Sequence, residues 1–274
     1  MPKSLIALLI SGRATGWDNC LLPILNASQD YEIHVFMSIN NKNKNCYYFN
    51  AMKEQMKKYV KGCFIKQFVV PDDFHNTSTH VQTVKQLVNE KYVPLNILSM
   101  YWNYQNAFNM ACEYQTINNI KYDRFMTFRA DIIIDKIPVL PMNNNTLYTI
   151  NQPCQFTGFG NYNESIVSPE WTYGDQNIME KYVATYDYIL EQTKHNSDYI
   201  CHYESNCTDN CHFLHLDIIH IPNIRYKIDA NRRRFDNWAD IGDTRITNIN
   251  NRTIDYQDIN TVTHNNLYVA PIKN

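Results

Sequence analysis

Three apolar runs, separated by segments with helical spacing, open the chain. The runs cover residues 5–10, 31–39 and 63–70, of which the first is apolar throughout and the other two are mostly apolar. A strand reads as a continuous apolar run when both of its faces are covered, as in a parallel sheet. Helical spacing at 19–27 and 47–61 completes a β-α-β-α-β pattern. The sequence therefore predicts an α/β fold built on a mostly parallel sheet.

Length and composition suit a globular domain of the size of an enzyme. The chain has 274 residues, of which 44% are hydrophobic and 19% are charged, enough for one large domain or two small ones. We expect one domain over 1–228 and a polar extension over 229–274 that packs on it or trails from it. The net charge of −2 excludes recognition of nucleic acid through bulk electrostatics.

No stretch of the sequence predicts a membrane span or a secretory signal. None reaches the roughly 18 apolar residues that a membrane helix needs. The run at 5–10 is short for a signal peptide and is not followed by a cleavage site of small residues. The eight Cys residues are therefore expected to be reduced thiols. The prediction is a soluble, cytoplasmic protein.

The stretch Lys121–Asp135 places charged residues at the end of an apolar strand. Its sequence is KYDRFMTFRADIIID, so that Arg129 and Asp131 follow the apolar residues directly. Burial of a carboxylate is costly unless another group pairs with it. Ligands of open α/β sheets bind at the carboxyl ends of the strands. We therefore expect Asp131 to face a metal–diphosphate group with Arg129 beside it. The alternative is a surface pair between these two side chains.

Two further segments carry candidate chemistry at the ends of predicted elements. The loop Ser11–Gly16 (SGRATG) follows the first strand, and Gly12 and Arg13 are candidates for contacting a nucleotide phosphate. The loop is neither a dinucleotide-binding fingerprint nor a P-loop, and a plain turn is the alternative. Asp175 begins a helix that is predicted to run to about Gln192. Local chemistry favours Asp175 as a helix cap, because a carboxylate there interacts well with the helix dipole.

A long helix is predicted between the third strand and the Lys121–Asp135 stretch. Residues 97–114 place Leu98, Tyr101 and Phe108 at helical spacing, which gives one buried stripe. Asn103 and Asn106 lie beside this stripe. We assign the stripe to the core, because aromatic residues at helical spacing usually pack there.

A segment rich in Cys and His follows the predicted helix that Asp175 begins. It runs from 201 to 220 and contains Cys201, His202, Cys207, Cys211, His212, His215 and His220. The C-x5-C-x3-C spacing matches no common structural zinc pattern. We favour one of these His residues as a single ligand of an active-site metal, and a structural zinc site remains the alternative.

Several short motifs occur in an order that resembles a known family. They are Ser11–Gly12 with an Arg after the first strand, Ser99–Met100 before a long helix, Tyr122–Asp123 leading to Arg129–Asp131, and Gly174–Gln176 before a helix. Together they resemble the GT-A-fold glycosyltransferases that use nucleotide-sugars, of the kind encoded in surface-glycan gene sets of bacteria and large DNA viruses. The resemblance covers residues 3–220. It implies a Rossmann-like, mixed, mostly parallel sheet flanked by helices.

The resemblance also implies roles for residues on the donor side. Asp131 would occupy the last position of the DxD-type motif, which binds Mn²⁺ or Mg²⁺ and the diphosphate. Arg129 stands at the first acidic position of that motif, where it could neutralise the diphosphate itself. Gly12 and Arg13 would hold the nucleotide.

On the acceptor side, the resemblance gives Asp175 the place of an acidic residue that acts as general base in inverting members. A late His often binds the metal in this fold. His215 is our candidate to do so with Asp131, and His212 and His220 are the others.

We therefore expect a glycosyltransferase that moves a hexose, deoxyhexose or pentose from a nucleotide-sugar, a UDP-sugar by preference, to a glycan acceptor. A cation or an Arg must meet the charge that develops on the leaving diphosphate. The irregular connection at 151–169 would shape the acceptor site. The alternatives are an inactive nucleotide-sugar-binding protein, a zinc-dependent interaction module over 201–220, and a nucleotidyltransferase.

Overall fold

A computed structural model of the chain describes residues 3–12, 30–40, 62–68, 94–129, 132–134, 143–150, 167–169, 171–195, 210–211, 213–221 and 226–228. Nine strands and three helices form within these ranges. In chain order they are β1 (Ser4–Gly12), β2 (Tyr31–Asn40), β3 (Gly62–Phe68), α4 (Pro94–Asn118), β4 (Arg124–Arg129), β5 (Ile132–Ile134), β6 (Thr146–Ile150), β7 (Trp171–Gly174), α5 (Gln176–Val183), α6 (Thr185–His195), β8 (Asp217–Ile221) and β9 (Tyr226–Ile228).

Seven of these strands form one sheet in the order β3-β2-β1-β4-β7-β6-β8. Strand β1 is parallel to β2 and β4, β2 is parallel to β3, and β6 is parallel to β8. Strand β7 is antiparallel to both of its neighbours, β4 and β6, so it alone runs against the other strands of this sheet. The predicted fold class, a mixed and mostly parallel α/β sheet flanked by helices, is confirmed.

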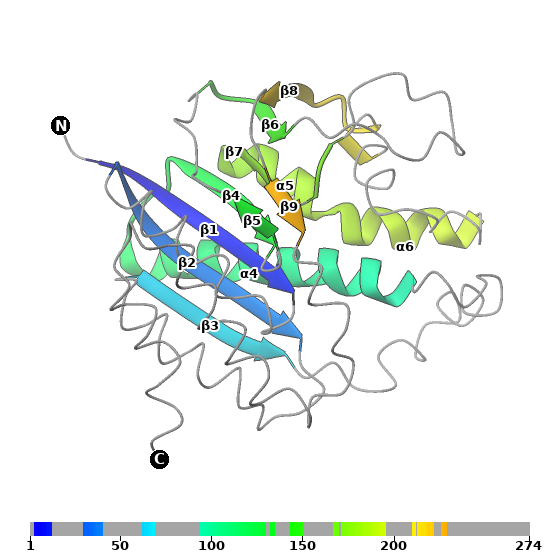
Figure 1. The fold of residues 1–274 in the computed structure, drawn as a ribbon, viewed down its shortest axis with the longest axis horizontal. Helices are drawn as coiled ribbons and strands as arrows, with labels where there is room; N and C mark the ends of the chain where they lie inside the picture. Colours follow the sequence, from blue (N-terminus) through cyan, green and yellow to red (C-terminus); the bar gives the residue numbers. More distant parts are fainter. Residues whose placement is uncertain are drawn as a thin grey trace, which may run out of the picture.

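The direction of the strands gives the sheet two distinct edges, which we name for the parallel strands. The carboxyl edge is where β1, β2, β3, β4, β6 and β8 end, and the amino edge is where they begin. Figure 1 shows the arrowheads of β1, β2 and β3 pointing to the same side, with α4 extending past them.

Helix α4 covers one face of the sheet, where it contacts β1 and β2. It runs against the parallel strands. Asn103, in its first half, bonds to Ser38 near the end of β2, whereas Tyr114, in its last turns, packs on His34 near the start of β2. The first turns of α4 therefore lie toward the carboxyl edge.

The core of this face contains the apolar stripe that was predicted for the long helix. Leu98, Tyr101 and Phe108 are all buried, and the helix is longer at both ends than the expected 97–114. The opposite face of the sheet is buried as well, since Ile6, Leu8 and Ile10 of β1 have almost no exposed surface. Cover on both faces explains why the first apolar run is continuous.

The apolar run that was expected to form a single strand up to Asp135 is divided in two. Strand β4 ends at Arg129, and β5 begins at Ile132. Strand β5 leaves the main sheet and pairs with β9 in a separate two-stranded sheet. The backbone therefore changes partners within the segment that carries Arg129 and Asp131, and a late part of the chain is brought beside it.

A short strand precedes Asp175, where we expected only an irregular connection and the start of a helix. Strand β7, with the sequence WTYG, is fully buried between β4 and β6. The helix expected to follow is two helices, because α5 ends at Val183 and α6 begins at Thr185.

Other predicted segments lie outside the described residues. They are the helices at 19–27 and 47–61, most of the connection at 151–169, and the extension at 229–274. None of the helices that the structure describes is long and apolar enough to cross a membrane.

Candidate functional site

Polar residues take the place of apolar ones where β1, β2 and β4 reach the carboxyl edge. Ser11 on β1 is the register partner of Ser38 on β2 and of Arg129 on β4. On β3, the register partner of Ser38 is Lys66. Register partners in a sheet project to the same face, and Ser38 faces α4 because its hydroxyl donates to Asn103. Ser11 and Arg129 therefore belong to the face that α4 covers.

One buried polar atom on β1 and one on α4 have no hydrogen-bond partner. The Asn103 side chain is satisfied, since its Oδ1 accepts from Ser38 Oγ at 2.6 Å and its Nδ2 donates to the Ser99 carbonyl at 2.7 Å. In contrast, Ser11 Oγ and Asn106 Nδ2 are buried without a partner. An unmade buried hydrogen bond costs about 1–3 kcal/mol. Such a group in a native structure requires an explanation, and a polar ligand is one.

The hydroxyl groups two residues further into the sheet are satisfied. Thr127 on β4 accepts a hydrogen bond from the Thr172 N–H at 3.1 Å. Thr149 on β6 accepts one from the Ser168 N–H at 2.9 Å. The missing partner of Ser11 is therefore not shared by Thr127 and Thr149, whose hydroxyl groups face α4 further from the end of β1.

The structure brings together two of the residues that were predicted to bind the donor. Gly12 is the last residue of β1, and Arg129 is the last residue of β4 and is partly buried. Their strands are neighbours and end at the same edge. Arg13 and Asp131 lie outside the described residues.

Asp175 lies at the opposite edge from Gly12 and Arg129. It follows Gly174, which pairs with Phe125 at the start of β4. Four residues of strand separate Phe125 from Arg129, a distance of roughly 13 Å. The separation follows from the antiparallel direction of β7.

The carboxylate of Asp175 also has two backbone donors. Its Oδ1 accepts from the Ile178 N–H at 3.0 Å, which caps α5, and its Oδ2 accepts from the Asn145 N–H at 2.7 Å. Both oxygens are therefore used to hold the start of α5 against the start of β6. This arrangement favours the capping role that local chemistry indicated over the role of general base.

His215 is at the amino edge too. It is exposed and has a positive φ of 51° in the turn before β8. The first residue of β8, Asp217, pairs with Thr146, the first residue of β6. A metal site shared by His215 and Asp131 does not fit this arrangement, because the described residues that flank position 131 lie beyond the other edge. Of His215 and His220, the backbone of His220 is the nearer to the carboxyl edge, since it pairs with Thr149 near the ends of β8 and β6, whereas His212 lies outside the described residues.

The described ranges contain no group of three or more His, Cys, Asp or Glu side chains that could hold a metal ion. Cys211 belongs to the zinc alternative, yet it is fully buried, and burial raises the pKa of its thiol to about 12. The side chains of Cys201, Cys207 and His212 lie outside the described residues.

Sequence reasoning missed Ser11, Asn103 and Asn106 as parts of the site. A signal was present for Ser11, because it is the polar residue that ends a continuous apolar strand. Asn103 and Asn106 stand beside the apolar stripe of α4, where two amides in a buried helix face need partners. The side chains that could supply those partners come from β1 and β2, which are distant in sequence.

Comparisons with known proteins identify solved structures but no family. No family model matches the chain, and no curated protein matches it. The glycosyltransferase GlyE of Streptococcus pneumoniae matches over 80% of this chain and 46% of its own, with 8% identity and a TM-score of 0.41. This chain therefore spans less than half of the length of GlyE.

Two other solved structures match over more of their own length. Core-mannan synthase A (CmsA) from Aspergillus fumigatus, in a Mn/GDP form, matches over 81% of this chain and 74% of its own, with 10% identity and a TM-score of 0.48. The galactosyltransferase LgtC, in complex with donor and acceptor sugar analogs, matches over 77% and 70%, with 10% identity and a TM-score of 0.42. At this level of similarity the matches assign no substrate and no residue role to this chain.

Proposed function

We propose that this chain is a glycosyltransferase that moves a sugar from a nucleotide-sugar, a UDP-sugar by preference, to a glycan acceptor at the carboxyl edge. One observation carries the proposal. Ser11 Oγ and Asn106 Nδ2 are buried without partners, and Ser11 is in register with Arg129 where the parallel strands end. This edge is where open α/β sheets bind their ligands.

The residues at this edge match the charge of a nucleoside diphosphate. Arg129 would neutralise part of the negative charge that develops on the leaving diphosphate, which stabilises the transition state. Gly12, which has no side chain, would let a phosphate approach the backbone at the end of β1. The Ser11 hydroxyl and the Asn106 amide would bond to polar groups of the donor. Arg13 and Asp131 keep their predicted roles beside them.

A divalent cation is part of the proposal only through Asp131. Mn²⁺ or Mg²⁺ would supply charge neutralisation at the diphosphate, and both bind one or two carboxylates together with substrate phosphate oxygens. His215 is not included as a ligand, because it lies at the amino edge. Arg129 would provide the charge at the end of β4 with or without a cation.

Binding of the donor is the first test. Thermal unfolding would be measured with nucleoside diphosphates and nucleotide-sugars, each with and without Mn²⁺, on the wild type and Asp131→Ala. A ligand at 100 times its Kd adds about 2.7 kcal/mol of stability. We expect a stabilisation that is specific for one nucleotide class and is weakened in Asp131→Ala. Asp30→Ala is the matched control, since Asp30 is an exposed carboxylate at the amino edge.

Each outcome of this panel has a definite meaning. A shift that needs Mn²⁺ and is lost in Asp131→Ala would support a metal–diphosphate site. A shift that persists without metal would assign the diphosphate to Arg129 and Arg13. The absence of a shift with every nucleotide would contradict the proposal.

Turnover separates the proposed enzyme from its rivals. Hydrolysis of the donor, or transfer to an added glycan, would eliminate a protein that only binds nucleotide-sugars. Release of pyrophosphate from a nucleoside triphosphate would instead support nucleotidyl transfer.

A further inference from the structure

An arginine near the amino edge is buried, and among the described residues it has no ion-pair partner. Arg124, the first residue of β4, is 5% exposed. Its two terminal nitrogens donate to the carbonyls of Asp123 and Asn143, at 2.6 and 3.2 Å, but Nε has no partner. The Asp123 carboxylate accepts instead from the Leu5 N–H at 2.8 Å. Among the described residues no carboxylate forms an ion pair with Arg124.

Two tyrosines on neighbouring strands add hydroxyl groups that also lack partners. Tyr173 on β7 pairs with Met126, which is two residues from Arg124 on the same side of β4. Tyr148 on β6 pairs in turn with Tyr173, and the two rings stack at 4.7 Å with an interplanar angle of 9°. Both hydroxyls are buried, and neither has a hydrogen-bond partner.

The Arg124 guanidinium lies close enough to Tyr173 to affect the pKa of its hydroxyl. Burial raises the pKa of Tyr173, the neighbouring Tyr148 and Tyr31 raise it further, and the Arg124 guanidinium lowers it. These side chains lie on the face of the sheet opposite to α4, because Ile6 and Met126 alternate with the residues that face the helix. The group is therefore separate from Ser11 and Arg129, in both the face and the edge of the sheet.

We propose that Arg124, Tyr148 and Tyr173 form a second binding site, for a small oxyanion such as phosphate or a carboxylate. A guanidinium N–H and two phenol O–H groups are all donors, and the group that would satisfy three donors and one positive charge is an anion. Charged donors without acceptors are costly in a buried site. Arg124 lies beside the exposed residues 143–145, which gives the anion a short path from solvent.

Anion-dependent stability tests this site without reference to glycosyl transfer. Thermal unfolding of the full chain would be followed against inorganic phosphate and against acetate, with chloride holding the ionic strength constant. We expect a saturable rise of Tm with at least one of the two oxyanions. The arm that responds identifies the phosphate or the carboxylate as the preferred ligand.

Removal of one tyrosine hydroxyl distinguishes a site that binds an anion from buried hydroxyl groups that bind nothing. In chloride, Tyr173→Phe is expected to be as stable as the wild type or more stable, because it removes a buried hydroxyl without a partner. In the stabilising oxyanion its affinity should fall about tenfold or more, since a bond to a charged group is lost. Tyr148→Phe should behave in the same way and serves if Tyr173→Phe does not fold.

Two control variants test whether the oxyanion-dependent rise of Tm arises at Arg124, Tyr148 and Tyr173. Tyr104→Phe removes a buried hydroxyl that donates to the Pro169 carbonyl at 2.8 Å, so it should be destabilised equally in chloride and in oxyanion. Arg129→Gln should keep the full oxyanion response, because Arg129 lies at the other edge. No saturable shift with either oxyanion, an unchanged affinity in both Phe variants, or loss of the response in Arg129→Gln would overturn the proposal. The last result would place the anion at the proposed donor site.

Discussion

On the face of the sheet that α4 covers, the amino edge and the carboxyl edge carry different kinds of side chains, although the same strands form both. At the amino edge, the His34 ring packs edge-on against Phe64, Tyr114 and Tyr122, and its Nδ1 lies 2.8 Å from the Tyr122 hydroxyl. A Cβ on Gly62 would collide with the His34 ring, so this packing leaves no room for a larger residue. At the carboxyl edge, Ser11 Oγ is buried and unsatisfied.

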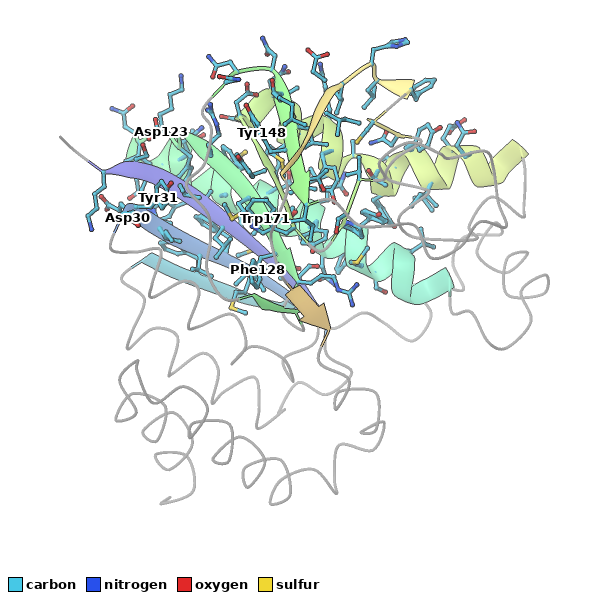
Figure 2. All side chains as sticks on the ribbon, turned by 45° about the horizontal axis from the view of Figure 1, so that its top comes forward. Asp30, Tyr31, Asp123, Phe128, Tyr148 and Trp171 are labelled. Atoms are coloured by element: carbon cyan, nitrogen blue, oxygen red, sulfur yellow. The ribbon has the colours of Figure 1, made fainter. Side chains whose placement is uncertain are left out.

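The change takes place within single strands. On β1 the residues toward α4 are Ala7 and Leu9 in the core cluster, and then Ser11. On β2, Phe36 is followed by Ser38 in the same way. Figure 2 shows Asp123 and Tyr31 near the end of the sheet where β1 begins and Phe128 toward its other end. Close aromatic packing stabilises one end, whereas the other end carries the buried polar groups that we propose bind the donor.

The largest expected effect is on stability, in the aromatic packing that precedes the polar end of β2. Phe36→Ala removes a ring that has no exposed surface and stacks on Phe64 at 5.0 Å. It should lower the free energy of unfolding by about 3–5 kcal/mol, measured by denaturant titration. The Kd of the folded variant for the donor should not change. Phe36→Leu, which keeps most of the volume, is the control. A large loss of donor affinity in folded protein would contradict the division between the two edges.

The next effect is on activity at the carboxyl edge. Arg129→Gln removes the positive charge that would meet the diphosphate, and donor hydrolysis or transfer should fall by about 10²–10³-fold. Its loss of stability should be smaller than that of Phe36→Ala, because Arg129 ends its strand and is only partly buried. Lys121→Gln, at an exposed cation, should leave the rate unchanged. Wild-type rates in Arg129→Gln would remove Arg129 from the site.

A pair of variants tests whether the Asp175 carboxylate, which lies at the amino edge, is structural or catalytic. Asp175→Asn keeps an oxygen that can cap α5, whereas Asp175→Ala loses the cap and should be less stable by about 0.5–2 kcal/mol. Neither should reduce turnover per folded molecule if the carboxylate is structural. A large loss of turnover in Asp175→Asn, with normal stability, would restore the role of general base.

The smallest expected effect comes from Ser11. Removal of its hydroxyl should leave stability unchanged or raise it slightly, and should weaken donor binding. Ser11→Ala removes a buried hydroxyl without a partner, so stability should stay the same or rise by up to about 1 kcal/mol, while donor affinity falls by up to about tenfold. Thr127→Val is the matched control, since Thr127 has partners on β7. It should be destabilised by about 1–3 kcal/mol with donor affinity unchanged. If Ser11→Ala were destabilised like Thr127→Val, the hydroxyl would have a structural role.

Much of the fold could be predicted because the signals for it are local. The continuous apolar runs of β1 and β2 and the helical stripe of α4 follow from the burial of each element on its own. The cap at Asp175 was also predicted, and the structure has it at this position. Gly12 and Arg129 could be placed at one edge, because parallel strands of one sheet end together.

The tertiary structure alone decided the direction of β7 and the change of sheet between β4, which ends at Arg129, and β5. A strand of four residues has the same alternation of side chains whichever way it runs, so WTYG carries no local signal of its direction. Pairing with β4 and β6 makes it antiparallel, which carries Asp175 to the amino edge. The residue types of the candidate site were thus determined by the sequence, whereas strand order and direction decided which of them meet.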